Sequence, residues 1–145
     1  MNTDALFKDL EPPPGGAERF AQRLDEVAAW DASAIRCLAR SHRDPGNPMR
    51  AGAELPALCG IEYAAQAMAV HGRLCAAVTE KPRAGYLASV SDVVCSVRRL
   101  DDLDTELVIE AEKLAGDEAR VQYRFTITSN HTQILTGKAA VVLSA

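Results

Sequence analysis

A glutamate and a glutamine interrupt an otherwise small and apolar stretch, LPALCGIEYAAQAMAVHG, which runs from Leu55 to Gly72. Glu62 and Gln66 lie four residues apart, so on a helix both side chains project from one face, where the amide can orient the carboxylate. Burying a carboxylate is unfavourable unless it is protonated or hydrogen-bonded, and stability alone favours an apolar residue here. The pair therefore indicates acid–base chemistry. The alternative is a structural acid that the helix dipole and an arginine stabilise, for example across a dimer interface.

The composition is that of a soluble globular protein with one core. The chain has 145 residues, of which 48% are hydrophobic and 25% are charged, and its formal net charge is -4. A domain of this size buries roughly 70% of the surface that its unfolded chain exposes. Nothing in the charge indicates nucleic-acid binding. No apolar run is long enough for a signal peptide or a membrane span, so we expect a cytoplasmic protein.

The cysteines give no sign of a metal or redox site. Cys37, Cys59, Cys75 and Cys95 lie in apolar surroundings and lack the paired spacing that such sites use. We expect reduced thiols in the core, and we expect no metal and no cofactor.

Turn signals and changes of hydrophobic period divide the chain into predicted elements. Residues 1–19 form a lead-in, with one short helix over 3–9 that ends before three prolines and two glycines. Residues 57–78 are rich in alanine and hold no glycine-proline break, which predicts the main helix. Alternating side chains and turn residues predict strands over 20–30, 33–40, 85–98, 105–114, 121–128 and 133–143.

The main helix sets the fold class, because it is apolar nearly all round as far as Arg73. A surface helix has one apolar stripe and a broad polar face, so this helix must be enclosed on most sides. No further helix is predicted that could cross between parallel strands, and the sheet should be mainly antiparallel. We therefore expect a single α+β domain over 1–145 with the hotdog fold, in which a long curved sheet wraps around one central helix.

The segment PALCGIEYAAQ, residues 56–66, resembles the PGxxxxExxAQ pattern on the helix of hotdog-fold 3-hydroxyacyl-(acyl carrier protein) dehydratases. Ala57 stands where that family usually has glycine. LDEVAAWD, residues 24–31, resembles the family's first strand. GIEYAAQAMA, residues 60–69, is similar to the GIEYxAQAxA helix of the ApeP-like branch, which is found with aryl-polyene biosynthesis. The resemblance covers almost the whole chain.

The resemblance implies a dimer with active sites at the subunit interface, where a carboxylate from one helix meets a histidine from a loop of the other chain. Carried over by position, Glu62 is the acid and Gln66 is its helper. The backbone amides at Ala57 and Leu58, at the helix N-terminus, would bind the thioester carbonyl of the substrate.

The expected histidine is displaced in this chain. The family places it fourteen residues before the acid, and neither that position nor its equivalent in a shorter loop is a histidine here. His42, at the end of the second predicted strand, is the nearest candidate, and its alternative is an ordinary surface histidine. His71 follows Glu62 by nine residues, which at about 100° per residue places it on the far side of the helix in a structural role. His131 lies in a predicted hairpin turn and should face solvent.

The resulting hypothesis is dehydration of a 3-hydroxyacyl thioester, on an acyl carrier protein or on coenzyme A, to the trans-2-enoyl thioester in fatty-acid-like or polyene-like biosynthesis. His42 would take a proton from C2, and protonated Glu62 would give one to the departing hydroxyl. One alternative is a hotdog acyl thioesterase, because such a carboxylate can also activate water. Another is a non-catalytic acyl-binding or partner subunit. A homodimer is expected, with a hetero-oligomer containing another hotdog protein as the alternative.

The acyl chain should lie in an apolar tunnel along the helix, lined by Ala65, Ala69 and Val93. The sequence does not set the length or head group of that chain. Six basic residues could steer an acidic carrier protein to the site, and the alternative for each is an ordinary solvated surface charge. They are Arg43, Arg50, Lys81, Arg83, Arg98 and Arg99.

Overall fold

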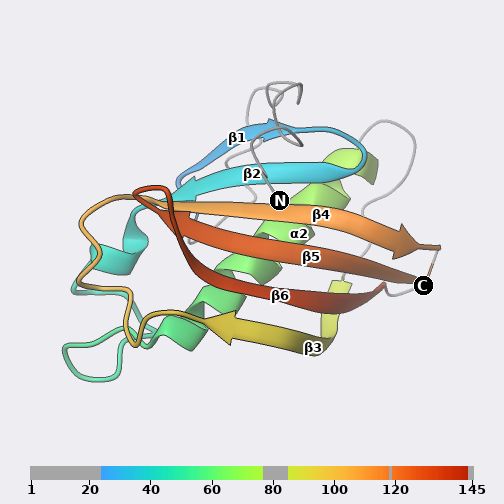
Figure 1. Ribbon diagram of the computed structural model, residues 1–145. Helices are drawn as coiled ribbons and strands as arrows, with labels where there is room; N and C mark the ends of the chain where they lie inside the picture. The colour runs from blue at the N-terminus through green and yellow to red at the C-terminus, as the bar shows by residue number, and fades with distance from the viewer. Residues whose placement is uncertain (1–23, 77–84, 118, 144–145) are drawn as a thin grey trace.

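Six strands and one long α-helix make up most of the structure, a computed structural model that describes residues 24–76, 85–117 and 119–143 (Figure 1). The elements are β1 (Glu26–Trp30), β2 (Ala34–Ala39), the short 3-10 helices η2 (Ser41–Arg43) and η3 (Ala57–Cys59), α2 (Gly60–Ala76), β3 (Gly85–Cys95), β4 (Leu107–Gly116), β5 (Arg120–Ser129) and β6 (Thr132–Leu143). No helix among these residues is long and apolar enough to cross a membrane.

The predicted elements agree closely with the observed ones. Every strand after β1 begins and ends within three residues of its predicted range. The strand predicted over 20–30 is shorter, because β1 begins at Glu26 and residues 24 and 25 are not in the sheet. The predicted main helix begins with the 3-10 turn η3 and becomes α-helical at Gly60. The predicted helix over 3–9 and the rest of the lead-in lie outside the described residues.

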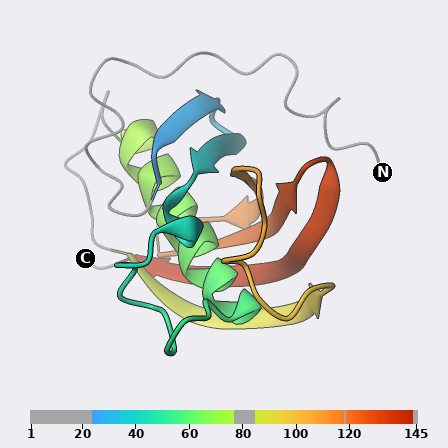
Figure 2. The ribbon, with the colours of Figure 1, turned by 90° about the vertical axis from the view of Figure 1, so that its left-hand side faces the viewer.

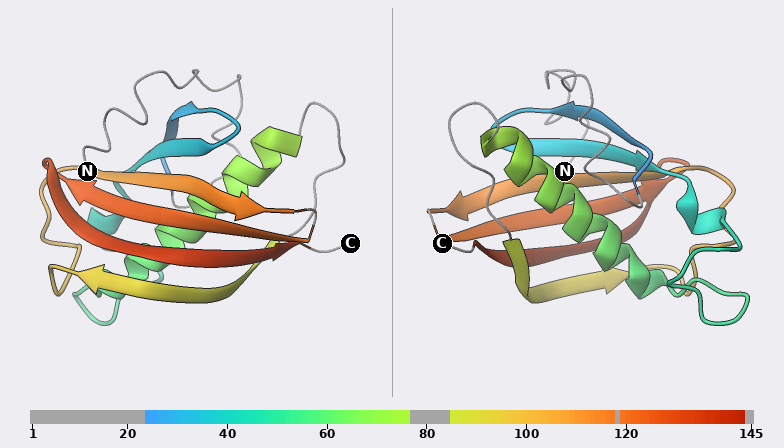
Figure 3. Two further views of the ribbon diagram at one scale, coloured as in Figure 1. Left: turned by 45° about the vertical axis from the view of Figure 1, so that its right-hand side comes forward. Right: turned by 180° about the vertical axis from the view of Figure 1, so that it is seen from behind.

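The strands form one sheet in the order β1-β2-β4-β5-β6-β3, and all neighbouring pairs are antiparallel. Both α2 and β3 come between β2 and β4 in the sequence, so the chain crosses the sheet with α2 and adds β3 at the far edge. The sheet curls around α2, which crosses its concave face (Figure 3). The predicted hotdog fold is confirmed.

Alternation along the strands places one set of side chains against the helix. Fully buried residues recur at every second position of the central strands, and α2 contributes a matching apolar face. The strand residues are Ile35, Cys37, Ile109, Ala111, Phe125 and Ile127, and the helix residues are Tyr63, Ala64, Ala67, Met68, Val70 and Leu74. The core therefore lies between the helix and the concave face of the sheet.

Gly60 brings the start of α2 close to the sheet. A Cβ atom at this position would lie 2.8 Å from Leu135 Cδ2 and 3.0 Å from Ile127 Cδ1. Contacts this short are not tolerated in a close-packed core, so a larger residue would displace these two side chains or the helix itself. The absence of a side chain at Gly60 therefore allows the first turns of α2, which carry Glu62, to pack closely on the sheet.

One face of α2 remains uncovered, and the expected enclosure on most sides is therefore only partly correct. Exposed residues recur at helical spacing along this face, with half-buried Ala65 and Gln66 between them. We call this set the open stripe; its exposed members are Leu58, Glu62, Ala69, Gly72 and Arg73. The sequence predicted an enclosed helix because alanine, glycine and leucine count as apolar residues even where they are exposed.

The edge strand β3 exposes apolar side chains near both of its ends, and its last residues lie beside the start of α2 (Figure 2). Tyr86 is 63% exposed and Val94 is 65% exposed, and Leu58 at the helix start is 59% exposed. Figure 2 shows the N-terminal end of α2 lying close to the end of β3. An exposed apolar edge strand favours coverage by another chain, because its backbone can pair and its side chains can be buried.

The cysteines are free thiols in different surroundings. Cys37 is buried, which raises the pKa of its thiol to about 12. Cys59 is half-buried, and Cys75 and Cys95 are exposed. The prediction of core thiols is therefore correct for Cys37 and wrong for Cys75 and Cys95.

Candidate active site

Glu62 and Gln66 lie in the first two turns of α2, on the open stripe. Glu62 is exposed and Gln66 is half-buried, and the helix projects both from one face, as their spacing predicts. No described residue covers the Glu62 carboxylate. The expected burial of this carboxylate is therefore not present in the single chain as the structure describes it.

The backbone at the start of the helix is fixed by the connection between β3 and β4. The Ala57 N–H donates to the Arg98 carbonyl at 3.0 Å, and the Leu100 N–H donates to the Leu55 carbonyl at 2.8 Å. The Ala57 amide is therefore engaged within the chain. Among the described residues, the Leu58 amide has no backbone acceptor outside its own helical turn.

An ion-pair cluster holds the same two segments together. The Glu54 carboxylate lies 2.9 Å from Arg98 Nη1 and 3.0 Å from Arg99 Nη1. The Asp101 carboxylate accepts hydrogen bonds from the Arg99 guanidinium and, at 2.8 Å, from the Leu55 amide. These donors, with Arg99 first, hold the pKa of Asp101 well below its usual range. These contacts anchor the loop before α2 to the connection between β3 and β4.

His42 lies in η2 with its ring enclosed by the chain. Its side chain is 1% exposed, and its Nε2 lies 3.1 Å from the Leu103 carbonyl. A carbonyl only accepts, so Nε2 carries the hydrogen and Nδ1 keeps its lone pair. Among the described residues Nδ1 has no hydrogen-bond partner. The expected alternative of an ordinary surface histidine is excluded by this burial.

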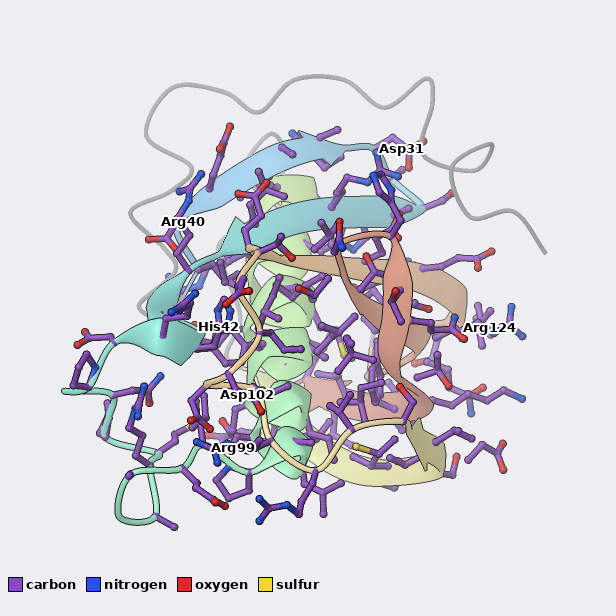
Figure 4. The ribbon with its side chains drawn as sticks, turned by 60° about the vertical axis from the view of Figure 1, so that its left-hand side comes forward. Asp31, Arg40, His42, Arg99, Asp102 and Arg124 are labelled. Atoms are coloured by element: carbon purple, nitrogen blue, oxygen red, sulfur yellow. The ribbon has the colours of Figure 1, made fainter. Side chains whose placement is uncertain are left out.

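The surroundings of His42 keep its ring neutral. Burial lowers the pKa of His42, and the carbonyls of Leu103 and Thr105 oppose that effect more weakly. A neutral imidazole with an available lone pair is the form that acts as a general base. Figure 4 shows the His42 side chain between η2 and the helix, with Arg99 and Asp102 nearer the start of α2.

A surface hollow lies beside His42, at the end of the sheet where β2 leads into η2. Its lining residues are Arg40, His42, Arg43, Asp104, Thr105 and Glu106. Arg40 pairs with Glu106 at 3.0 Å, and Arg43 pairs with Asp104 at 3.1 Å. The charged side chains around the hollow are therefore matched in ion pairs.

His71 and His131 have the places that the sequence predicts. His71 is 1% exposed, its Nδ1 lies 2.7 Å from Tyr123 Oη and its Nε2 lies 2.8 Å from the Asp31 carbonyl. Both ring nitrogens are satisfied, which confirms a structural role. His131 is exposed in the turn between β5 and β6, which confirms that it faces solvent.

Most of the basic residues expected to steer a carrier protein are engaged inside the chain. Arg43, Arg98 and Arg99 form ion pairs, and Arg50 donates to the carbonyls of Asp44 and Ala53. Their charges are therefore largely used in fixing the loops around the helix start. The other two, Lys81 and Arg83, lie outside the described residues.

Other expected site features can also be placed. Ala65 is half-buried and Ala69 is exposed on the open stripe, whereas Val93 is half-buried and packs against the core. No group of three or more histidine, cysteine, aspartate or glutamate side chains suited to a metal ion occurs among the described residues.

Tyr63 is a site residue that the sequence interpretation did not identify. It follows Glu62 but points into the core with 0% exposure, and its Oη lies 2.7 Å from Ser41 Oγ and 3.2 Å from Asn47 Nδ2. Ser41 is the residue before His42. A buried tyrosine requires a partner for its hydroxyl, so one tyrosine in an alanine-rich helix is the signal that points to this contact.

The fold and the helix-borne carboxylate define a hotdog protein, and solved structures share this fold. The dehydratase heterocomplex ApeI:P from Xenorhabdus doucetiae is 21% identical with a TM-score of 0.74, covering 96% of this chain and 91% of that chain. A thioesterase from Haemophilus influenzae is 11% identical with a TM-score of 0.62, covering 90% and 83%. A hypothetical thioesterase with coenzyme A from Streptococcus pneumoniae is 10% identical with a TM-score of 0.62, covering 83% and 85%.

The family is given by sequence. The family model for the ApeP dehydratase, of the ApeP-like family, matches residues 22–144. The chain therefore belongs to the ApeP-like dehydratase family, and the resemblance carried by its helix is confirmed. No curated protein sequence matches the chain at a significant level.

Proposed function

We propose that this chain acts in the dehydration of a 3-hydroxyacyl thioester to the trans-2-enoyl thioester. The observation that carries the proposal is the Glu62 carboxyl group on the open stripe, one helical turn from the Gln66 amide and close to the Leu58 amide at the helix start. Membership of the ApeP-like dehydratase family supports it. A carboxyl group covered by a partner chain keeps its proton more strongly, which suits a proton donor.

The reaction requires one base and one acid. His42 Nδ1 takes the proton from C2, the bond between C3 and oxygen breaks, and Glu62 gives its proton to the departing hydroxyl to form water. Gln66 orients the Glu62 carboxyl group, and the Leu58 amide binds the thioester oxygen as negative charge develops on it. Proton exchange with solvent then returns Glu62 and His42 to their starting forms.

A second hotdog chain completes the site in this proposal. Uncovered apolar residues on β3 and on the open stripe provide the surface, and the neighbour ApeI:P is a heterocomplex. The second chain is a copy of this one or a different hotdog protein. The substrate is proposed to arrive on an acyl carrier protein; coenzyme A is the alternative, since one neighbouring thioesterase structure contains coenzyme A. A cytoplasmic location stays a prediction.

A second candidate function is that of a partner subunit which supplies Glu62 but not the base. The enclosure of His42 favours it, because in the single chain the ring is 1% exposed and a substrate carbon must reach its Nδ1. A third candidate, thioester hydrolysis, is favoured by the thioesterases that share the fold.

Substitution of the proposed acid tests the dehydratase proposal. For Glu62→Gln we expect the rate of enoyl formation from a 3-hydroxyacyl carrier thioester to fall by about 100-fold or more, because the amide has no acidic proton to give. Thermal unfolding should change little, because Glu62 is exposed. Glu26→Gln is the matched control, since Glu26 is an exposed carboxylate on β1. Wild-type rates in both variants would exclude Glu62 as the acid.

A further inference from the structure

The Tyr63 hydroxyl joins helix α2 to the turn that carries His42. Tyr63 Oη lies 2.7 Å from Ser41 Oγ, and Asn47 Nδ2 lies 3.2 Å from the same oxygen. Asn47 Nδ2 also donates to the Ser41 carbonyl at 2.9 Å. Because the Asn47 amide nitrogen only donates, the Tyr63 oxygen accepts from it, and the Tyr63 O–H is available to donate to Ser41 Oγ. The Ser41 hydroxyl therefore contacts Tyr63 of α2, and the Ser41 carbonyl is bound by Asn47, which also contacts Tyr63.

Asn47 is fully used in this arrangement. Its amide nitrogen serves Ser41 and Tyr63, and its Oδ1 accepts from the Met49 N–H at 2.9 Å. Its side chain is buried, with 7% exposure for the residue. A buried amide with each group paired fixes the path of the loop, because any shift leaves a polar atom without a partner.

The ring of His42 has few supports of its own. Its side-chain hydrogen bond runs from Nε2 to the Leu103 carbonyl, which lies on the connection between β3 and β4. The backbone of His42 is placed by η2, whose first residue is Ser41. The contact from Leu103 to the ring and the contact from Tyr63 to the turn therefore both help to place Nδ1.

We propose that Tyr63 is a positioning residue, whose hydroxyl holds the η2 turn so that His42 presents Nδ1 as the base. The proposal rests on the proposed function, in which His42 takes the proton from C2. Tyr63 does not touch the substrate in this account. It also gives a reason for a hydroxyl at a fully buried helix position where phenylalanine would fill the same space.

The chain offers a matched control for this role. Tyr123 is also buried, with 4% exposure, and its Oη lies 2.7 Å from His71 Nδ1. Tyr63→Phe and Tyr123→Phe each remove one buried hydroxyl and one hydrogen-bond network, and they differ in which histidine is affected. If Tyr63 served only to stabilise the fold, the two variants should lose similar stability and should not differ in activity.

The first measurement is kinetic. For Tyr63→Phe we expect kcat to fall by about tenfold with KM little changed, because the base is misplaced while substrate binding remains. The acid limb of the pH–rate profile, which reports protonation of the base, should move to higher pH as the ring becomes more solvated. Tyr123→Phe should retain wild-type kcat. Equal losses of kcat in the two variants would overturn the positioning role.

The second measurement does not depend on turnover. Side-chain nitrogen NMR of the wild-type protein should show His42 protonated on Nε2, and Tyr63→Phe should raise its pKa towards the ordinary value without changing His71. Tyr123→Phe should change only the His71 signals. An unchanged His42 titration in Tyr63→Phe would contradict the proposal. Absence of dehydration by wild-type protein would instead count against the proposed function, while the NMR result still decides whether Tyr63 holds His42.

Discussion

The two buried histidines of this protein, His42 and His71, differ in what their ring nitrogens contact. Each is 1% exposed. Both nitrogens of His71 have partners within 2.8 Å, whereas Nδ1 of His42 has none among the described residues. Buried polar atoms are nearly always paired, so Nδ1 of His42 calls for an explanation, and a role as a base is the one proposed above. Burial alone therefore does not distinguish the two histidines, which differ in whether the second ring nitrogen has a partner within the described part of the chain.

The supports of the two rings differ in the same way. His71 is held by Tyr123 from β5 and by the Asp31 carbonyl at the β1–β2 turn, which Figure 4 places at the opposite end of the sheet from His42. His42 is held by η2 and by the carbonyl of Leu103, both in connections between elements. Residues that act on substrates are often carried on loops above a rigid framework, and His42 has that setting.

The same substitution at both positions tests this comparison most strongly. His42→Gln keeps an amide N–H for the Leu103 carbonyl but removes the basic nitrogen, so we expect turnover to fall by about 100-fold or more with the fold retained. The measurement is the rate of enoyl formation per folded protein. Wild-type turnover in this variant would instead favour the partner-subunit function, in which the base comes from another chain.

His71→Gln should affect stability rather than turnover. The glutamine can still donate to the Asp31 carbonyl, but Tyr123 Oη loses its acceptor in a buried site. We expect the free energy of unfolding to fall by about 1–3 kcal/mol, as is usual for a buried polar group left unpaired. Urea unfolding measures this change. A catalytic defect in His71→Gln at full stability would remove the distinction between the two histidines.

The pH dependence of stability should show a smaller effect. Burial lowers the pKa of both His42 and His71 below the ordinary value of 6.5, and for His71 the Lys113 charge acts in the same direction. Below this value the unfolded chain binds protons that the folded chain resists, so the free energy of unfolding falls as the pH drops. The loss begins near the unfolded pKa and continues down through the folded pKa values.

Urea unfolding of wild-type protein and His71→Gln at about pH 7.5 and about pH 5.5 measures this dependence. The variant has one titrating group fewer, so its stability should fall less between the two pH values. An equal fall in both proteins would show that His71 does not contribute, and a rise in stability on acidification would contradict the burial of both rings.

Much of the fold could be predicted from the sequence because its signals are local. Strand alternation, turn residues and one long alanine-rich segment give the strands and α2, and helical geometry gives the inward position of His71. The GIEYAAQAMA helix gives the family. These features depend on residues that are close together in the chain.

The rest depends on contacts between residues far apart in sequence. Leu103, which sets the protonated nitrogen of His42, comes sixty-one residues later, and Glu54 pairs with Arg98 across forty-four residues. The exposure of Glu62 could not be predicted either, because this exposed helix face has the same apolar composition as a buried one.

The central claim is that the chain acts in removing water from a 3-hydroxyacyl thioester. Its most direct test is mass measurement of a carrier protein loaded with a 3-hydroxyacyl group, after incubation with the wild-type chain alone and together with a candidate hotdog partner. The account predicts an acyl group that stays on the carrier and is lighter by one water. Release of the free acid, or an unchanged acyl group under both conditions, would contradict it.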